Sequence, residues 1–192
     1  MTAREICQSI ANGEITAEEV TAMYLRRIEK WGGRDALNAV AQVNPYAMDE
    51  ARRLDESGDR NLPLFGVPVL VKDNIDVKGM VTSAGSLALA DNVATKDARI
   101  IENLRKNGAV ILGKTNMTEF ANYTSGKMPA GFSSYGGQVK HAYDAGVSPS
   151  GSSSGSGVAM SAGLCAAAVG TDTSFSVIHC AMGNSSQCTE NR

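Results

Sequence analysis

Two serines and one lysine are the residues of this chain best suited to covalent chemistry. Ser152 and Ser176 each lie in a glycine- and serine-rich segment, and Lys72 directly follows the apolar run 69–71. A serine hydroxyl becomes an effective nucleophile only when a neighbouring base removes its proton. A lysine can act as that base when burial lowers the pKa of its ammonium group toward neutral pH. Together, the three residues predict serine chemistry that depends on a lysine.

Each of these residues also has an ordinary structural interpretation. Lys72 can pass its apolar stem through the core and pair at the surface with Asp73 or Asp76. The serine-rich segment 148–157 is, by composition, a flexible linker, a phosphate-binding loop or a rigid catalytic loop. The glycine and lysine spacing of a phosphate-binding loop is absent from the chain. The linker and the catalytic loop stay open, although the helix and strand patterns that follow directly are untypical of a linker.

A histidine is the base most often found beside a catalytic serine, and this chain has two. His141 lies in a polar loop, and His179 lies near the end of the chain. Neither neighbouring sequence resembles that of a catalytic histidine. We therefore expect both histidines to be surface residues.

The first half of the chain predicts helices followed by a buried strand. Thr16 and Glu19 form a capping box, which indicates the start of a helix with one apolar face. A weaker helix is predicted over residues 45–54. Residues 66–71 then have the pattern of a short buried strand, which Lys72 closes. This strand is the element expected to hold the lysine stem in the core.

The second half of the chain continues the alternation of helices and strands. Residues 97–107 have the period of a helix, with Ile100, Ile101 and Leu104 on its apolar face. A strand is expected at residues 109–113, a helix of small residues at 158–163 and a third buried strand at 164–169. This alternation indicates the α/β fold class.

The composition indicates a soluble globular chain of one domain or part of one. Its 192 residues are 43% hydrophobic and carry a net charge of −2 without blocks of either sign, which disfavours contact with nucleic acid or an anionic membrane. The four cysteines form no CxxC pair, so we expect reduced thiols and no metal site. No apolar segment is long enough for secretion or membrane insertion. We expect a cytoplasmic protein that acts on a small neutral molecule.

Four stretches carry a more specific pattern: residues 64–74 (LFGVPVLVKDN), 113–120 (GKTNMTEF), 149–156 (PSGSSSGS), and 170–173 (GTDT) with Ser176. In order and spacing they resemble the motifs of the amidase signature family of serine hydrolases, over roughly residues 16–180. The resemblance implies an α/β fold with a mixed central sheet flanked by helices. It also implies hydrolysis of an amide C–N bond in a small-molecule substrate.

The resemblance implies a role for each candidate residue. Lys72 matches the base, Ser152 matches a bridging serine that follows a cis peptide bond, and Ser176 matches the nucleophile. The implied reaction is amide hydrolysis through an acyl-enzyme, with Ser152 relaying a proton between Ser176 and Lys72. The backbone N–H groups expected to bind the oxyanion and the substrate are those of Thr173, Ser174 and Phe175.

The chain also departs from the family pattern. Ser174 and Phe175 stand where most members have two glycines, and Ile178 stands where an arginine is common. Farther on, the family's next glycine-rich strand is absent. We therefore expect residues 1–181 to be the N-terminal part of a single amidase domain, truncated in its second half, and residues 182–192 to be a polar tail. Such a chain is expected to be marginally stable or to aggregate.

Three functions are compatible with these patterns. The first is an amide hydrolase that uses Ser176, Ser152 and Lys72 without a cofactor. The second is a non-catalytic, truncated remnant of such an enzyme. The third is the amidase-like subunit of a tRNA-dependent amidotransferase, in which a partner subunit supplies the contact with nucleic acid. The absence of a basic stripe argues against direct nucleic acid contact by this chain.

Overall fold

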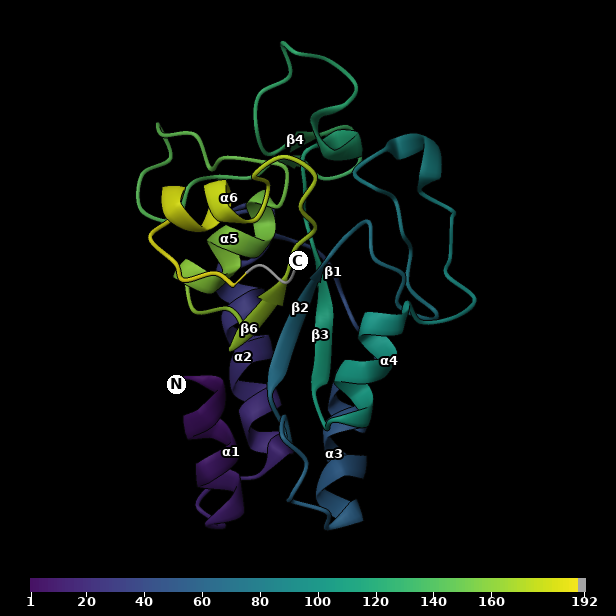
Figure 1. Ribbon diagram of the computed structural model, residues 1–192, viewed down its shortest axis with the longest axis vertical. Coiled ribbons are helices and arrows are strands. Elements are labelled where there is room, and N and C mark those ends of the chain that lie inside the picture. Colours follow the sequence, from purple (N-terminus) through teal and green to yellow (C-terminus); the bar gives the residue numbers. More distant parts are fainter. Residues whose placement is uncertain (190–192) are drawn as a thin grey trace.

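A mixed four-stranded sheet forms the centre of the computed structural model, which describes residues 1–189 (Figure 1). The strand order is β1-β3-β2-β6, and β2 runs parallel to both β3 and β6, whereas β1 is antiparallel to β3. The strands are β1 (Val40–Val43), β2 (Pro68–Lys72), β3 (Val110–Thr115) and β6 (Ala167–Val169). The expected α/β fold with a mixed central sheet is confirmed.

Helices cover both faces of this sheet. The α-helices are α1 (Ala3–Ala11), α2 (Ala17–Trp31), α3 (Ala47–Ser57), α4 (Arg99–Lys106), α5 (Ser154–Ser161) and α6 (Ile178–Gly183). The shorter elements are the 3₁₀ turns η1 (Leu87–Leu89) and η2 (Glu119–Asn122) and the hairpin of β4 (Phe132–Ser133) and β5 (Gly137–Gln138). Figure 1 shows α5, α6 and the long loops gathered toward the end of the sheet at which β2 and β3 finish.

The core is divided by the sheet into two apolar clusters. Leu70 points into a cluster formed mainly with helices α1, α2, α3 and α5. Val69 and Val71 point to the other face and pack with Ile101 of α4 and with the loop that follows β2. Successive side chains of a strand alternate between faces, so a strand between two such clusters buries the side chains of both faces. This explains why all five residues of β2 are buried.

Two capping boxes begin the first two helices. Thr16 accepts a hydrogen bond from the backbone of Glu19 and starts α2 as predicted. Thr2 and Glu5 form the same arrangement at the start of α1, a helix that was not predicted. The Thr-x-x-Glu spacing was the available signal for this helix.

Several predicted elements need correction. Ile100 of α4 is 46% exposed, because the buried face of this short helix is centred on Ile101. The third strand, β6, is shorter than predicted and only partly buried, because within residues 1–189 it pairs with β2 alone. Helix α5 begins at Ser154, four residues before the small-residue helix predicted from residue 158. The antiparallel strand β1 was not predicted.

The chain continues through the predicted boundary at residue 181 within α6. Just after this helix, Asn184 is buried, and its side chain donates to the backbone carbonyls of Pro149 and Cys180. Asn184 of the predicted polar tail is thus packed against the rest of the chain, whereas Met182 is exposed. Within the described residues, no helix has the length and apolar character needed to span a bilayer.

Candidate active site

Lys72, the last residue of β2, lies wholly inside the protein. Its Nζ is 2.8 Å from Ser152 Oγ and 2.9 Å from Thr171 Oγ1, and it also donates to the Thr171 carbonyl at 3.3 Å. Burial lowers the pKa of Lys72 to about 8, because removal from water disfavours the charged ammonium. Surface pairing with Asp73 or Asp76 is wrong, since the Lys72 side chain is 0% exposed and its partners are Ser152 and Thr171.

Ser152 lies between the lysine and the second serine. The Gly151–Ser152 peptide bond is cis, as the family resemblance implied. Ser152 Oγ is 3.1 Å from Ser176 Oγ, and the Ser152 backbone N–H also donates to Ser176 Oγ at 3.2 Å. A continuous path of hydrogen bonds therefore joins Lys72, Ser152 and Ser176, although 80 residues separate the first two along the chain.

The loop before α5 is held by the segment that follows β3. Thr118 donates its backbone N–H to the carbonyl of Ser152 at 3.1 Å. A Cβ on Gly151 would lie 2.6 Å from Thr118 Oγ1, and a Cβ on Gly155 would lie 2.4 Å from the carbonyl oxygen of Asn116. Glycine is therefore required at both positions for this close approach. The motif 113–120 thus supports the serine loop, a role that the sequence motif did not specify.

Thr171 is a site residue that sequence reasoning missed. Its carbonyl and its hydroxyl both accept hydrogen bonds from Lys72, and its hydroxyl also accepts one from Asn74 Nδ2 at 3.0 Å. Its neighbour Asp172 accepts the backbone N–H of Val177 at 2.8 Å and so closes the turn that carries Ser176. The Gly-Thr-Asp-Thr motif contained this residue, but its spacing did not show that the lysine would point to it.

The residues predicted to bind the oxyanion form an exposed turn before Ser176. Thr173, Ser174 and Phe175 are exposed, whereas Ser176 is buried. Phe175 adopts a φ of +65°, a left-handed conformation that suits the glycine expected here from the family resemblance, and the residue is 71% exposed. Within the described part of the chain, the backbone N–H groups of these three residues donate to no protein acceptor. These groups are therefore free to bind a ligand oxygen.

A second buried lysine lies beside the first but has a different partner. Lys114 of β3 is wholly buried, with its Nζ 3.4 Å from Asp73 Oδ1 and 3.1 Å from the Val81 carbonyl. Ser83 donates its hydroxyl to the other oxygen of Asp73. Burial raises the pKa of the Asp73 carboxyl, and the Lys114 ammonium opposes this change. The pair links the ends of β2 and β3 next to Lys72.

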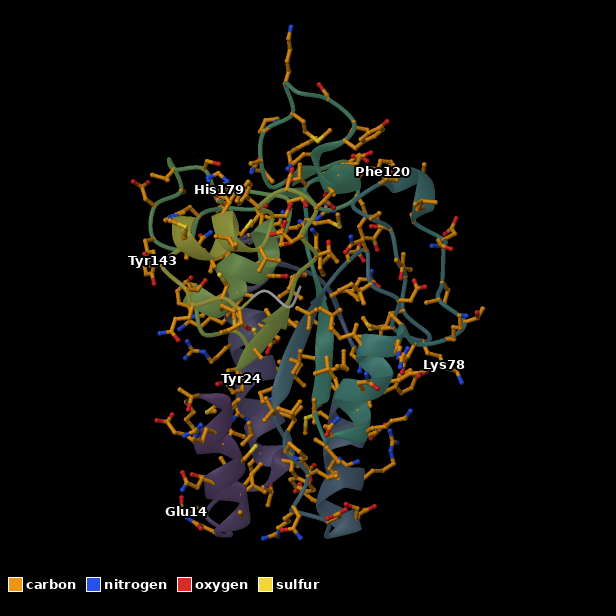
Figure 2. The ribbon with its side chains drawn as sticks, in the orientation of Figure 1. Glu14, Tyr24, Lys78, Phe120, Tyr143 and His179 are labelled. Carbon is orange, nitrogen blue, oxygen red and sulfur yellow. The ribbon has the colours of Figure 1, made fainter. Side chains whose placement is uncertain are left out.

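The histidines lie outside this arrangement. His141 is buried, and its Nε2 is 2.6 Å from the carbonyl of Gly183, so the expectation of a surface position was wrong for this residue. The ring forms a hydrogen bond with the carbonyl of the last residue of α6 and so fixes the loop that contains His141. His179 is exposed on α6 as expected (Figure 2).

Cys180 is the thiol that interacts electrostatically with Lys72. It is buried, and burial raises the pKa of its thiol to about 12. The thiol is therefore protonated near neutral pH and is a poor competitor for the role of nucleophile. Among residues 1–189, no group of three or more histidine, cysteine or acidic side chains is placed to hold a metal ion.

A mixed α/β sheet that presents a buried lysine to two serines is the arrangement expected of amidase-type proteins. The family model described as Amidase matches residues 19–182, and the chain belongs to this family. A probable amidase of Arabidopsis thaliana is 39% identical over 190 residues, which are 96% of this chain and 37% of the plant protein. A glutamyl-tRNA(Gln) amidotransferase subunit of Methanosarcina barkeri is 43% identical over 164 residues, covering 85% of this chain and 32% of that protein.

A solved structure shows the same likeness. The native peptide amidase from Stenotrophomonas maltophilia superposes with a TM-score of 0.89 at 40% sequence identity, over 96% of this chain and 38% of that enzyme. The chain thus spans a little over a third of the length of the peptide amidase and of the plant relative. This chain contains Lys72, both serines and the sheet that positions them.

Proposed function

We propose that this chain carries the catalytic serine, relay serine and base of an enzyme that hydrolyses linear amides. The hydrogen-bonded path from Lys72 through Ser152 to Ser176 is the observation that carries the proposal. It joins a nucleophile to a base whose pKa of about 8 leaves roughly a tenth of the amine neutral at pH 7. The proposal requires no metal and no organic cofactor, because protein groups and water supply each step.

The first half of the reaction is acylation. Neutral Lys72 accepts the proton of Ser152, which takes the proton of Ser176 as the Ser176 oxygen attacks the amide carbon. The C–N bond breaks, the acyl group stays on Ser176, and the leaving amine receives the proton that Lys72 held. In the second half, the same residues take a proton from water, which attacks the ester and releases the acid.

The negative oxygen of the tetrahedral intermediate needs hydrogen-bond donors in fixed positions. We assign this role to backbone N–H groups of Thr173, Ser174 and Phe175, which are unpaired within the described residues and lie immediately before Ser176. The resemblance to a peptide amidase supports small amides, including peptide amides, as the substrate class. The free thiols of Cys7, Cys165, Cys180 and Cys188 support the proposal that the protein works in a reducing compartment such as the cytoplasm.

Labelling with a fluorophosphonate probe tests the nucleophile directly. Peptide mapping is expected to find the phosphonyl group on Ser176, and Ser176→Ala is expected to abolish the label. Lys72→Ala and Ser152→Ala are expected to slow both labelling and the hydrolysis of an aryl amide by about 10²–10⁴-fold, the range of general acid–base catalysis. Ser57→Ala, which removes an exposed serine hydroxyl at the end of α3, serves as a matched control that should label normally. A folded chain that hydrolyses no amide and leaves Ser176 unlabelled would instead be a non-catalytic remnant.

The likeness to an amidotransferase subunit supports a second candidate function. In that case the chain would release ammonia from an amide donor and pass it to a reaction on a partner subunit. Glutamine is the donor to test, because a glutaminase activity that requires Ser176 and rises only when a second protein is added would favour this alternative. Hydrolysis of simple amides at the same rate with or without a partner would favour the first proposal.

A further inference from the structure

A pocket of about 360 Å³ lies beside the serine and lysine residues and has no role in the mechanism above. Its lining is formed by Asn74, Ala84, Met117, Phe120, Ala121 and Tyr123. These residues come from the end of β2, from the loop that crosses it, and from the segment that follows β3. Figure 2 shows Phe120 among the loops at the end of the sheet where these strands finish.

Hydrogen bonds connect the walls of this pocket to the reactive residues. Asn74 Nδ2 donates to Thr171 Oγ1, which also accepts a hydrogen bond from Lys72 Nζ. On the other wall, a Cβ built on Gly151 would lie 3.3 Å from Asn122 Oδ1, so the Phe120–Tyr123 turn lies against the peptide bond before Ser152. The pocket is therefore placed to receive a substituent of an amide that is bound at Ser176.

The pocket offers apolar surface and one unused hydrogen-bond acceptor. Its lining side chains carry no formal charge, and Phe120 and Tyr123 are 39% and 93% exposed. Asn74 Oδ1 is buried, and within residues 1–189 it accepts no hydrogen bond, although its Nδ2 is used. A buried acceptor without a donor is unfavourable, and a ligand N–H or O–H relieves that cost. A charged group would gain no ionic partner from this lining.

We propose that this pocket binds an uncharged, apolar substituent of the substrate and that Asn74 Oδ1 accepts a hydrogen bond from an N–H group next to the scissile amide. The inference rests on the proposed function, since it places the reacting amide at Ser176. It assigns selectivity for aromatic or aliphatic amides to Phe120 and recognition of the N–H to Asn74. Acidic and basic substituents are disfavoured.

Binding to the Ser176→Ala chain tests the selectivity without requiring turnover. Titration calorimetry is made with N-acetylphenylalanine amide, N-acetylalanine amide and the α-amide of N-acetylglutamate. The aromatic amide is expected to bind about tenfold or more tightly than the other two, in the range that a few carbon atoms contribute in an apolar pocket. Equal affinities, or no binding of the aromatic amide, would overturn the proposal.

Two phenylalanines with the same exposure provide a matched pair for the apolar wall. Phe120→Ala, made in the Ser176→Ala chain, is expected to abolish the preference for the aromatic amide. Phe132→Ala is the control, because Phe132 is also 39% exposed but does not line the pocket. A preference that survives Phe120→Ala in a variant with an unchanged melting temperature would contradict the assignment.

The hydrogen bond to Asn74 is tested by removing its donor from the ligand. O-Acetylphenyllactamide has an ester oxygen in place of the N–H and is expected to bind about three- to tenfold more weakly than the amide. Asn74→Leu should remove this difference, whereas Asn74→Asp, which keeps an oxygen acceptor, should preserve it. A difference that persists in Asn74→Leu would show that another group receives the N–H.

Failure of this inference and failure of the proposed function give different results. If the chain with Ser176 intact hydrolyses all three amides without the predicted preference, the pocket assignment is wrong and the proposed function stands. If the aromatic amide binds selectively but is never hydrolysed by that chain, the pocket assignment stands and the proposed function is wrong.

Discussion

Two buried lysines on neighbouring strands have different partners, and this difference changes how readily each loses its proton. Lys114 pairs in register with Val71, so it lies next to the residue that precedes Lys72. Burial lowers the pKa of both lysines, but the Asp73 carboxylate opposes this change at Lys114, whereas Lys72 meets hydroxyl and carbonyl oxygens. A carboxylate stabilises the charged form of lysine, but neutral oxygens do so less effectively. Lys72 is therefore the lysine that can lose its proton near neutral pH.

In the proposed mechanism, the pH dependence of the reaction follows from the protonation of Lys72. The base works only when neutral, so kcat/KM for an aryl amide is expected to increase tenfold per pH unit below about 8 and to level off above that value. The direction is fixed by the lowered pKa, because the charged form dominates below it. Steady-state rates between pH 5.5 and 9.5 provide the measurement. A profile that is flat through pH 8, or that falls as pH rises, would show that Lys72 is not the base.

The buried pair of Asp73 and Lys114 is predicted to contribute strongly to stability. Asp73→Asn keeps the shape of the side chain but leaves the Lys114 charge without a partner, which typically costs about 3–5 kcal/mol in a buried pair. Urea unfolding followed by circular dichroism measures the loss. Asp49→Asn, which removes an exposed partner of Arg52, is the matched control and should leave the unfolding midpoint unchanged. Equal midpoints for the two variants would refute the structural role of the buried pair.

At the scale of elements, the close approach of α5 to the segment after β3 holds the loop that contains Ser152 in place. A Cβ on Gly155 would lie 2.4 Å from the carbonyl oxygens of both Ala39 and Asn116, and these are backbone atoms that cannot move aside easily. The N-terminal turn of α5 therefore contacts both β1 and β3 through their flanking residues. Any displacement of this helix also displaces Ser152, which lies two residues before its first residue.

Gly155→Ala is expected to destabilise the protein, although alanine is the better helix former by about 1 kcal/mol. The steric conflict should lower the free energy of unfolding by about 3 kcal/mol or more. Chemical denaturation measures the difference. Gly126→Ala provides the control, because a Cβ there would meet nothing within 4 Å. A Gly155→Ala chain as stable as the control would mean that α5 is not packed this closely.

The elements that could be predicted from sequence are those with local chemical signals. The Thr16 capping box and the apolar run before Lys72 gave a helix and a strand at the correct places. Strand β1 has no such signal. Its pairing with β3 joins residues about 70 positions apart, and its side chains do not alternate between buried and exposed. The partnership of Thr171 with Lys72 and the orientation of Asn74 depend on the same long-range packing, so only the family motifs pointed toward that region.

At the scale of the whole molecule, the sheet between the two apolar clusters is expected to be the most stable part. Hydrogen exchange followed by mass spectrometry should find the slowest backbone amides in β2 and β3, which are buried along their length. Strand β6, paired on one side within residues 1–189, should exchange faster, and the exposed loop 121–127 fastest. Exchange in β3 that is as fast as in the loop would contradict this arrangement of the core.

The distance along the chain between the reactive residues has a consequence for how the protein can be studied. Lys72 lies 80 residues from Ser152 and 99 from Thr171, so no short peptide or isolated hairpin can bring these groups together. In the proposed mechanism, Ser176 becomes reactive only after the parallel strands have paired and α5 has docked. The rate at which Ser176 reacts with a phosphonate during refolding would therefore report the completion of tertiary structure, and this single hydroxyl can serve as an intrinsic chemical clock for folding.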